Sequence, residues 1–256
     1  TGRPARPVFN SDSRTLVRDA VWNLNTGRML LIDTQLEGKL QAGSTEHTVL
    51  AGLDVQRNHT GQKAWRAVAP AIDVYNPVYG NFTPPTASQL VRQPNVVQKQ
   101  LGFYAQDQIK WGQWTATLGL RHDNAQTDTE GRPAAAVDDK AWTKRAGVTY
   151  QMDGGWAPYA GYSESFQPLG GVDAYAAAYK PQRGEQWEAG VKWQPPGQGI
   201  NAFAAVYQLR EKNRKTTDPG NPLNSLQIGE VKVKGFEAEV QASLARNWDF
   251  TVGYAF

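Results

Sequence analysis

The stretch Leu101–Asp123, LGFYAQDQIKWGQWTATLGLRHD, decides the fold class of this chain. Apolar side chains recur at every second position on both sides of Gly112, and mostly polar side chains fill the positions between them. A period of two predicts two β-strands, each with one apolar face, joined by a very short turn. Each strand has about ten residues, which exceeds the ~5–6 typical of globular proteins and matches the ~9–11 that cross a bilayer. Trp111 and Trp114 flank the turn, where an aromatic belt would meet one membrane surface.

The composition is compatible with that interpretation. The chain has 256 residues, enough for one large or two small domains, with 40% hydrophobic residues and a mean hydropathy of -0.58. A soluble protein has such values, and so does a membrane β-barrel, because only alternate residues of each strand face lipid. No run of 18 apolar residues exists, so the sequence predicts no membrane-spanning helix.

The charged residues and the cysteine count exclude several function classes. The absence of cysteine excludes disulfides, thiolate metal sites and cysteine nucleophiles. The net charge is +3 and the pI about 9.0, but the 27 basic residues are scattered among 24 acidic ones without a basic block. We therefore expect no nucleic-acid partner. The chain starts at Thr1 with no signal peptide ahead of it, and we interpret it as an internal piece of a longer protein.

Period two recurs along the chain and predicts ten strands. They are expected at about 28–41, 46–58, 101–111, 114–123, 140–152, 156–166, 183–194, 199–212, 228–243 and 248–256, with one more strand end around Leu16–Trp22 in an otherwise irregular segment 1–27. One residue breaks the pattern: Asp107 falls on an apolar face, so its carboxylate should lie near an interface or meet a partner.

The connections between these strands alternate in length. Short ones fall near 42–45, 112–113, 153–155, 195–198 and 244–247, and long ones at 61–96, 128–139, 167–182 and 213–227. An antiparallel membrane barrel alternates in this way, because short turns lie on one side of the membrane and long loops on the other. The sequence thus predicts an all-β fold, a transmembrane antiparallel β-barrel. A soluble β-protein with long loops is the alternative.

Several segments, taken in order, resemble the barrel of TonB-dependent outer-membrane siderophore receptors. They are GFYAQDQIKW (102–111), YSESFQP (162–168), GEQWEAGVKW (184–193) and VKGFEAEV (233–240). The stretches DTQLEGKL (33–40), HTVLAGLDV (47–55) and AIDVYNPV (71–78) are most similar to ferrichrome and related hydroxamate receptors. The resemblance covers about Arg28–Phe256.

This resemblance implies a 22-stranded barrel in the bacterial outer membrane, closed around an N-terminal plug, that imports ferric siderophores with energy from TonB. Residues 1–256 would be part of the one barrel domain and supply about ten of its strands. The plug with its TonB-contacting segment and the first and last barrel strands would lie outside the chain. The implied partners are a ferric siderophore, outer-membrane lipid and, through the N-terminal part, TonB, and the receptor is expected to be a monomer.

No arrangement of residues predicts catalysis. Glu237 and Glu239 share a strand face about 7 Å apart by strand rise, and we interpret them as polar residues that face a barrel lumen. The histidines His47, His59 and His122 lie on separate strands without metal-ligand spacing. We therefore expect a protein that is not an enzyme and has no cofactor, with iron entering as a ferric-siderophore complex.

Binding is the better-supported role, and aromatic residues of the long loops are its candidates. A hydroxamate siderophore wraps Fe³⁺ in its own oxygens, so its receptor needs rigid aromatic surfaces and polar groups at the rim. The candidate ligand-binding residues are Trp65, Tyr75, Tyr79 and Phe82 in loop 61–96, Phe166 and Gln167 at the end of a strand, and Tyr175 and Tyr179 in the loop that follows. The resemblance favours Phe166, which matches a motif phenylalanine near the vestibule of hydroxamate receptors. Interfacial or loop packing is the alternative for each aromatic, and we expect Trp111, Trp114, Trp187, Trp193 and Trp248 on the belt or the lipid face.

Other functions remain as alternatives. A passive porin-like channel would share the barrel but lack a plug, and a soluble β-rich binding protein would share only the strands. Haem is the alternative substrate within the receptor class. Haem receptors typically carry Arg-Ala-Pro and Asn-Pro-Asn-Leu motifs shortly before the strand equivalent to 183–194, and both are absent from that region here.

Overall fold

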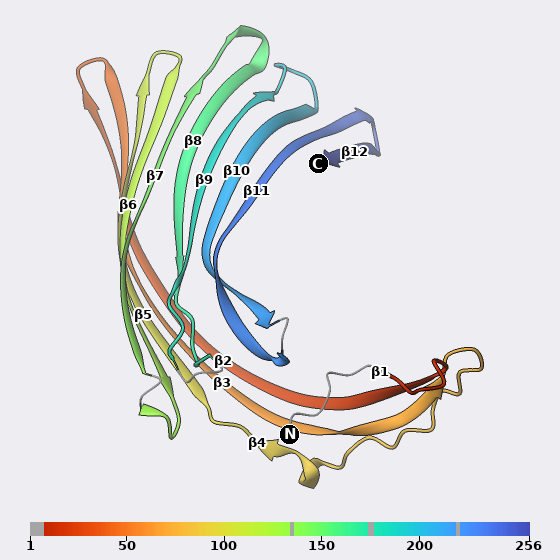
Figure 1. Ribbon diagram of the computed structural model, residues 1–256. Coiled ribbons are helices and arrows are strands. Elements are labelled where there is room, and N and C mark those ends of the chain that lie inside the picture. The colour runs from red at the N-terminus through yellow and green to blue at the C-terminus, as the bar shows by residue number, and fades with distance from the viewer. Residues whose placement is uncertain (1–7, 134–135, 174–176, 219–220) are drawn as a thin grey trace.

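The computed structural model describes residues 8–133, 136–173, 177–218 and 221–256, and these form one antiparallel sheet that curves into an unclosed arc (Figure 1). The strands are β1 (Val8–Phe9), β2 (Thr15–Ala42), β3 (Thr45–Asp73), β4 (Val91–Arg92), β5 (Val96–Trp111), β6 (Trp114–Thr129), β7 (Val137–Tyr150), β8 (Trp156–Gln167), β9 (Gln182–Trp193), β10 (Ile200–Asp218), β11 (Asn221–Ala245) and β12 (Trp248–Ala255). Neighbours in the sheet follow chain order, except that the short β4 pairs with β3 beside β5. Ten of these strands are long, which confirms the predicted number, and the all-β class is confirmed with them.

Short hairpin turns join the strands at one end of the sheet. Gly43 has φ 61°, Gly112 has φ 56° and Asn247 has φ 68°, which is the left-handed conformation that two-residue hairpins require and that glycine and asparagine adopt most readily. Two 3-10 turns, Ala87–Gln89 and Asp153–Gly155, are the helical segments of the described residues. Among those residues, no helix has the length and apolar character that a membrane crossing needs.

The two faces of the sheet differ as the alternation predicts. The register places Ile32 opposite Val55, and Leu53 opposite Phe103, on the outer face of the arc. Large apolar side chains on this face stay exposed, for example Leu118 at 51% and Trp187 at 62%. An exposed apolar band of this extent is typical of a surface that lipid covers.

Asp107 meets a partner on this outer face, as expected for a carboxylate there. Its Oδ2 lies 2.7 Å from Nδ1 of His47, and the other ring nitrogen of His47 lies 3.0 Å from the Thr45 hydroxyl. The pair explains how an acidic residue is accommodated among apolar neighbours.

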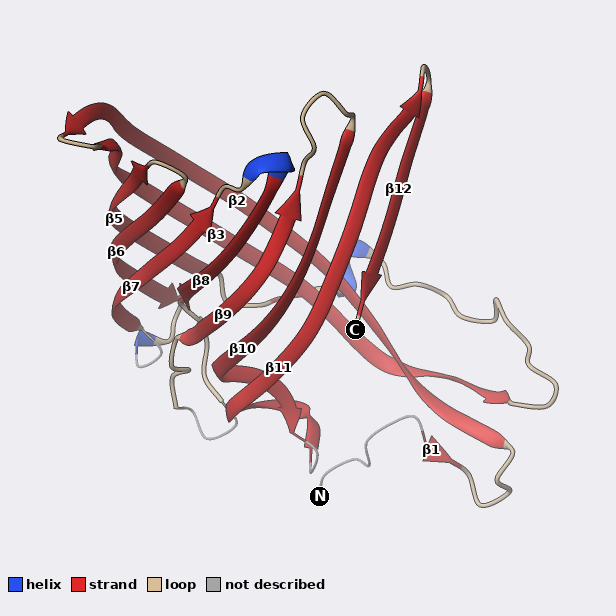
Figure 2. Ribbon diagram, turned by 90° about the horizontal axis from the view of Figure 1, so that it is seen from above, coloured by secondary structure: helices blue, strands red, loops and turns tan. Residues whose placement is uncertain are grey.

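Strands β2 and β3 are much longer than the sequence analysis predicted. They have 28 and 29 residues and pair along their length from Ala42↔Thr45 to Thr15↔Asp73, whereas β5 pairs with β3 only as far as Thr60. The outer part therefore projects as a two-stranded ribbon (Figures 1 and 2). The predicted loop 61–96 is wrong for its first part, and Trp65 lies in β3 opposite Trp22.

The predicted loop 213–227 is also wrong. Strand β10 continues to Asp218 and β11 starts at Asn221, with Lys215 opposite Gln227 in the ladder. Both errors have one physical cause. Beyond the lipid no face must be apolar, so the period of two disappears from the sequence while the backbone hydrogen bonds continue.

Strands β7 and β8 pair over a short length only. Their register runs from Thr149↔Tyr159 to Arg145↔Ser163, although β7 starts at Val137 and β8 continues to Gln167. Beyond Arg145 the two strands separate in a fork. The Glu164 carboxylate bridges it by accepting a hydrogen bond from the Lys144 backbone N–H at 3.2 Å.

The segment after β8 folds back over the inner face of the sheet. Gln98 of β5 donates to the Pro168 carbonyl at 3.2 Å, and Gly170 lies against Thr127 of β6, which is 1% exposed. The predicted irregular segment 167–182 is confirmed in its described part, with Gln167 and Gln182 forming the last pair of β8 and β9.

Candidate ligand-binding face

The inner face of the arc carries polar side chains, and two of them reach across a whole strand. Arg121 of β6 contacts Asp54 of β3, passing β5, and Tyr104 of β5 contacts Asp33 of β2, passing β3. Contacts that skip a strand are favoured where a surface curves toward the side chains, and the sheet forms a curved arc (Figure 1). The polar face is therefore the concave one, as in a barrel lumen.

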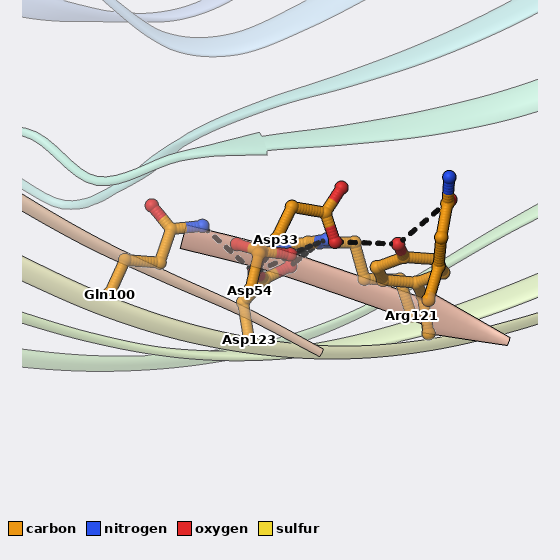
Figure 3. A network of polar contacts seen from close by, with 7 residues as sticks. Asp33, Asp54, Gln100, Arg121 and Asp123 are labelled. Carbon is orange, nitrogen blue, oxygen red and sulfur yellow. Dashed lines mark hydrogen bonds and ion pairs between the residues drawn. The ribbon is translucent and has the colours of Figure 1, made fainter. Parts of the chain in front are cut away.

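Arg121 is the centre of the polar network in Figure 3. Its Nη1 donates to Oδ2 of Asp54 at 2.5 Å, and its Nη2 donates to Oδ1 of Asp123 at 2.6 Å. Gln100 adds a hydrogen bond to the same Asp123 oxygen at 2.8 Å. Asp123 is only 2% exposed, so its charge depends on these donors for stability.

Local sequence makes room for this network. A Cβ atom on Gly102 would overlap the guanidinium of Arg121, so glycine at this position lets Arg121 lie flat against the sheet. Tyr104 lies in the same way over Gly52, where a Cβ would come within 2.5 Å of the ring. The Arg121 guanidinium carbon lies 5.8 Å from the centre of the Tyr104 ring.

A hollow of about 460 Å³ opens beside the network on the inner face. Its polar lining residues are Asp33, Asp54, Tyr104, Gln106, Arg121, Thr143, Lys144, Arg145, Ser163 and Glu164. These groups can donate and accept hydrogen bonds. Among the described residues, no group of three or more His, Cys, Asp or Glu side chains could hold a metal ion. The chemistry that the face offers is hydrogen bonding to a polar ligand.

Phe166 and Gln167 line a second, separate hollow of about 340 Å³. The other lining residues are Gln56, Asn58, Gln98, Lys99, Gln100 and Pro168. Phe166 is half-buried, and the Arg183 guanidinium carbon lies 5.8 Å from the centre of its ring. Phe166 and the amide side chains that line this hollow supply the two kinds of group that were predicted, an apolar contact and a polar rim.

The other residues predicted to bind ligand lie apart from the Phe166 hollow. Trp65 and Phe82 pack together with ring centroids 6.1 Å apart, at the ribbon. Seven residues of β3 separate Trp65 from Asn58 of the Phe166 hollow, or about 23 Å along a strand. Tyr75 and Tyr79 are 79% and 77% exposed in the segment after β3.

The loop after β8 supplies no free ring among its described residues. Tyr179 is only 5% exposed, with its hydroxyl donating to the Ser225 carbonyl and the Lys215 ammonium 4.0 Å from the centre of its ring. It packs the loop against β10 and β11. Tyr175 lies outside the described residues.

An ion pair joins the short strand β4 to the segment that follows β6. Glu130, after β6, accepts a hydrogen bond from Arg92 of β4 at 2.6 Å and another from the Asn95 backbone at 3.1 Å. The Arg92 hydrogen bond, followed by that from Asn95, lowers the pKa of the Glu130 carboxyl below its ordinary value.

Sequence reasoning missed the Arg121 network. The alternation places Asp54, Tyr104 and Arg121 on polar faces, but their meeting depends on the register between β3, β5 and β6. Two glycines could have indicated the network. Gly52 and Gly102 lie on the same polar faces as Asp54 and Tyr104, and the long side chains of Tyr104 and Arg121 cover them.

Comparison with known proteins defines the class. A family model described as "TonB dependent receptor-like, beta-barrel" matches residues 3–256, and the chain belongs to this family. The family places it in the bacterial outer membrane.

Individual relatives agree with the family. The chain is 36% identical over 235 residues to the ferrichrome outer membrane transporter/phage receptor of Escherichia coli K12, which covers 88% of this chain and 31% of the relative. It is 33% identical over 231 residues to the ferrioxamine B receptor of Salmonella typhimurium SL1344, covering 89% of this chain and 32% of that one. The ferripyoverdine receptor of Pseudomonas aeruginosa bound to ferripyoverdine has the same fold, with a TM-score of 0.77 at 19% identity over 96% of this chain and 34% of that one.

The chain thus spans about a third of the length of the curated relatives that it matches. These relatives are named as transporters and receptors, not as enzymes.

Proposed function

We propose that the chain is the wall of an outer-membrane receptor that imports ferric siderophores of the hydroxamate class. The observation that carries this proposal is the hollow that Phe166 and Gln167 line together with amide side chains of β3 and β5. The relatives named for ferrichrome and ferrioxamine B support the same ligand class.

In this proposal the chain is not an enzyme and has no cofactor of its own. Iron arrives already chelated, and Fe³⁺ is cargo held by the oxygens of the siderophore. The receptor acts as a monomer. A plug domain, the first and last barrel strands and the segment that contacts TonB lie in other parts of the full-length protein, and TonB supplies the energy for import.

Phe166→Ala in the full-length receptor tests the ligand site. Burial of a phenyl ring contributes about 1.5–3 kcal/mol, so we expect the affinity for a ferric hydroxamate siderophore to fall about tenfold to a hundredfold. Phe103→Ala is the matched control, because it removes the same ring from the outer face. Isothermal titration measures both variants.

The same titration with the gallium-loaded siderophore separates the two parts of the proposal. Binding should persist, because the receptor contacts the organic surface of the complex and not the metal. Unchanged affinity in Phe166→Ala would remove Phe166 from the site. Loss of binding with gallium would contradict an indirect role for the metal.

A further inference from the structure

The fork between β7 and β8 has a polar recess at its base. Five inner-face residues stand in one row across neighbouring strands, because the register pairs Gln106 with Gly119, Gly119 with Arg145, Arg145 with Ser163 and Ser163 with Gln186. Pairing of β7 and β8 ends at this row. The next row toward the short turns is Thr117, Gly147, Gly161 and Glu188. Together these residues line most of a hollow of about 290 Å³.

The middle of the recess holds no large side chain, because the two large side chains beside it, Arg145 and Tyr159, lie away from it in opposite directions. Arg145 lies over Gly119 of β6, where a Cβ would come within 2.8 Å of its Cγ. Tyr159 lies the other way, over Gly190 of β9, where a Cβ would come within 2.9 Å of its ring. Between them the paired Gly147 and Gly161 form a flat floor of half-buried backbone without side chains. A Cβ at Gly161 would meet nothing closer than 3.7 Å.

The hydrogen-bonding groups around this floor are incompletely used. The amide oxygen Oε1 of Gln106 is buried and accepts no hydrogen bond among the described residues. Arg145 forms no ion pair with any residue that the structure describes, although its stem is held over Gly119. In contrast, Glu188 is satisfied, since it accepts from the Tyr159 hydroxyl at 2.6 Å and from Gln186 at 3.0 Å.

The recess therefore offers a free cationic donor, Arg145, and an unsatisfied acceptor, Gln106, together on its β5–β6 side, next to a flat floor. A secondary amide is the complement of this set: it is planar, its carbonyl accepts, and its N–H donates. A buried amide oxygen without a donor carries a desolvation cost that an N–H would remove.

We propose that this recess is a binding subsite for a secondary amide, with Arg145 donating to the carbonyl and Gln106 Oε1 accepting from the N–H. This rests on the proposed function, because the amide is assigned to the backbone of an imported siderophore. A peptide bond from another part of the full-length protein offers the same chemistry, and the experiment distinguishes the two sources.

The test uses two ferric trihydroxamates that differ in one feature: one has secondary amides in its backbone, and the other has esters in their place. The ester keeps the carbonyl and lacks the N–H. Wild-type receptor should bind the amide probe about threefold to tenfold more tightly, the effect of one neutral hydrogen bond. Gln106→Met should abolish this preference. Arg145→Met should weaken both probes by similar factors.

Gly161→Val fills the recess without a backbone clash, and Gly253→Val is its matched control. Gly253 shares the inner face on β12, and a Cβ there meets nothing within 4 Å. We expect Gly161→Val to weaken both probes about tenfold, and Gly253→Val to leave them unchanged. The unfolding temperature of each variant is measured without ligand.

The outcomes distinguish a siderophore from a peptide bond as the source of the amide. An amide preference that Gln106→Met removes, with unliganded unfolding temperatures unchanged, supports the siderophore as the source. A lower unfolding temperature in Gln106→Met, Arg145→Met and Gly161→Val without ligand, and no amide preference, supports a peptide bond as the source. The inference is overturned if the wild type shows no preference and the three variants match it in both measurements. If the wild type binds neither probe, the proposed function fails, and the unfolding temperatures alone decide on the recess.

Discussion

At the scale of single residues, the polar network of the inner face is centred on one arginine. Arg121 compensates two carboxylates, and one of them, Asp123, is almost completely buried. The sequence predicted polar residues at these positions. It could not predict their network, since ion pairing across β5 depends on strand register.

Arg121→Met in the full-length receptor should cost about 3–5 kcal/mol of unfolding free energy, because it leaves a buried charge without its partner. Adding Asp123→Asn should recover part of the loss. The matched control is Arg66→Met, which removes an exposed ion pair with Asp19 and should cost about 0–1 kcal/mol. Urea titrations of refolding in lipid measure the three variants. Equal costs for Arg121→Met and Arg66→Met would contradict the central role of Arg121.

Glu130 gives a pH-dependent link between β4 and the segment that follows β6. Its pKa is lowered from 4.5 by Arg92 and the Asn95 backbone, so the folded state holds the carboxylate more strongly than the unfolded state. The stabilisation is complete above pH 4.5 and is lost as the pH falls through the folded value. We expect the Glu130 carboxyl signal in ¹³C NMR to titrate below the ordinary value, and Arg92→Ala to raise its midpoint. A midpoint that Arg92→Ala leaves in place would show that this ion pair does not hold the carboxylate.

At the scale of elements, the sequence located the lipid-crossing part of each strand better than its ends. Period two predicted the hairpin β5–β6, because lipid requires one apolar face there. It did not predict the outer parts of β3, β10 and β11, where both faces carry polar residues. The backbone hydrogen bonds of the sheet continue there, but the side chains do not alternate between apolar and polar, so the sequence pattern does not predict a strand. In the outer part of β2 it predicted only the strand end around Leu16–Trp22, which is confirmed.

Two neighbouring positions on β6 test the assignment of faces. Leu118 lies on the outer face and Thr117 lines the inner hollow. Leu118→Arg should cost about 2–4 kcal/mol near the bilayer midplane, whereas Thr117→Arg should cost much less because it faces water. Refolding titrations in lipid vesicles compare the two. Similar costs would contradict the alternation.

At the scale of the whole molecule, one side of the arc has the tight turns, and the other side has the longer connections that follow β3, β6 and β8. The segment after β3 keeps Tyr75 and Tyr79 exposed, while Trp111 and Trp114 flank the tight turn at Gly112. If the long connections are extracellular, chymotrypsin added to intact cells should cut after Tyr75 or Tyr79 and leave the Trp111–Trp114 turn whole. Mass spectrometry of the fragments locates the cuts. Cleavage after Trp111 from outside would reverse the topology.

The short seam at β7 and β8 has a mechanical consequence. The strands β2–β7 and β8–β12 form two plates of paired strands, and five residue pairs between β7 and β8 form the hinge line that joins them. Because few hydrogen bonds resist bending along a short seam, we expect the wall to bend at this line before it bends elsewhere, and its radius to change there. Gly147 and Gly161 face each other on the hinge itself, without side chains to brace it. Any molecule wedged at this line would set the angle between the plates, and with it the width of the passage that they enclose.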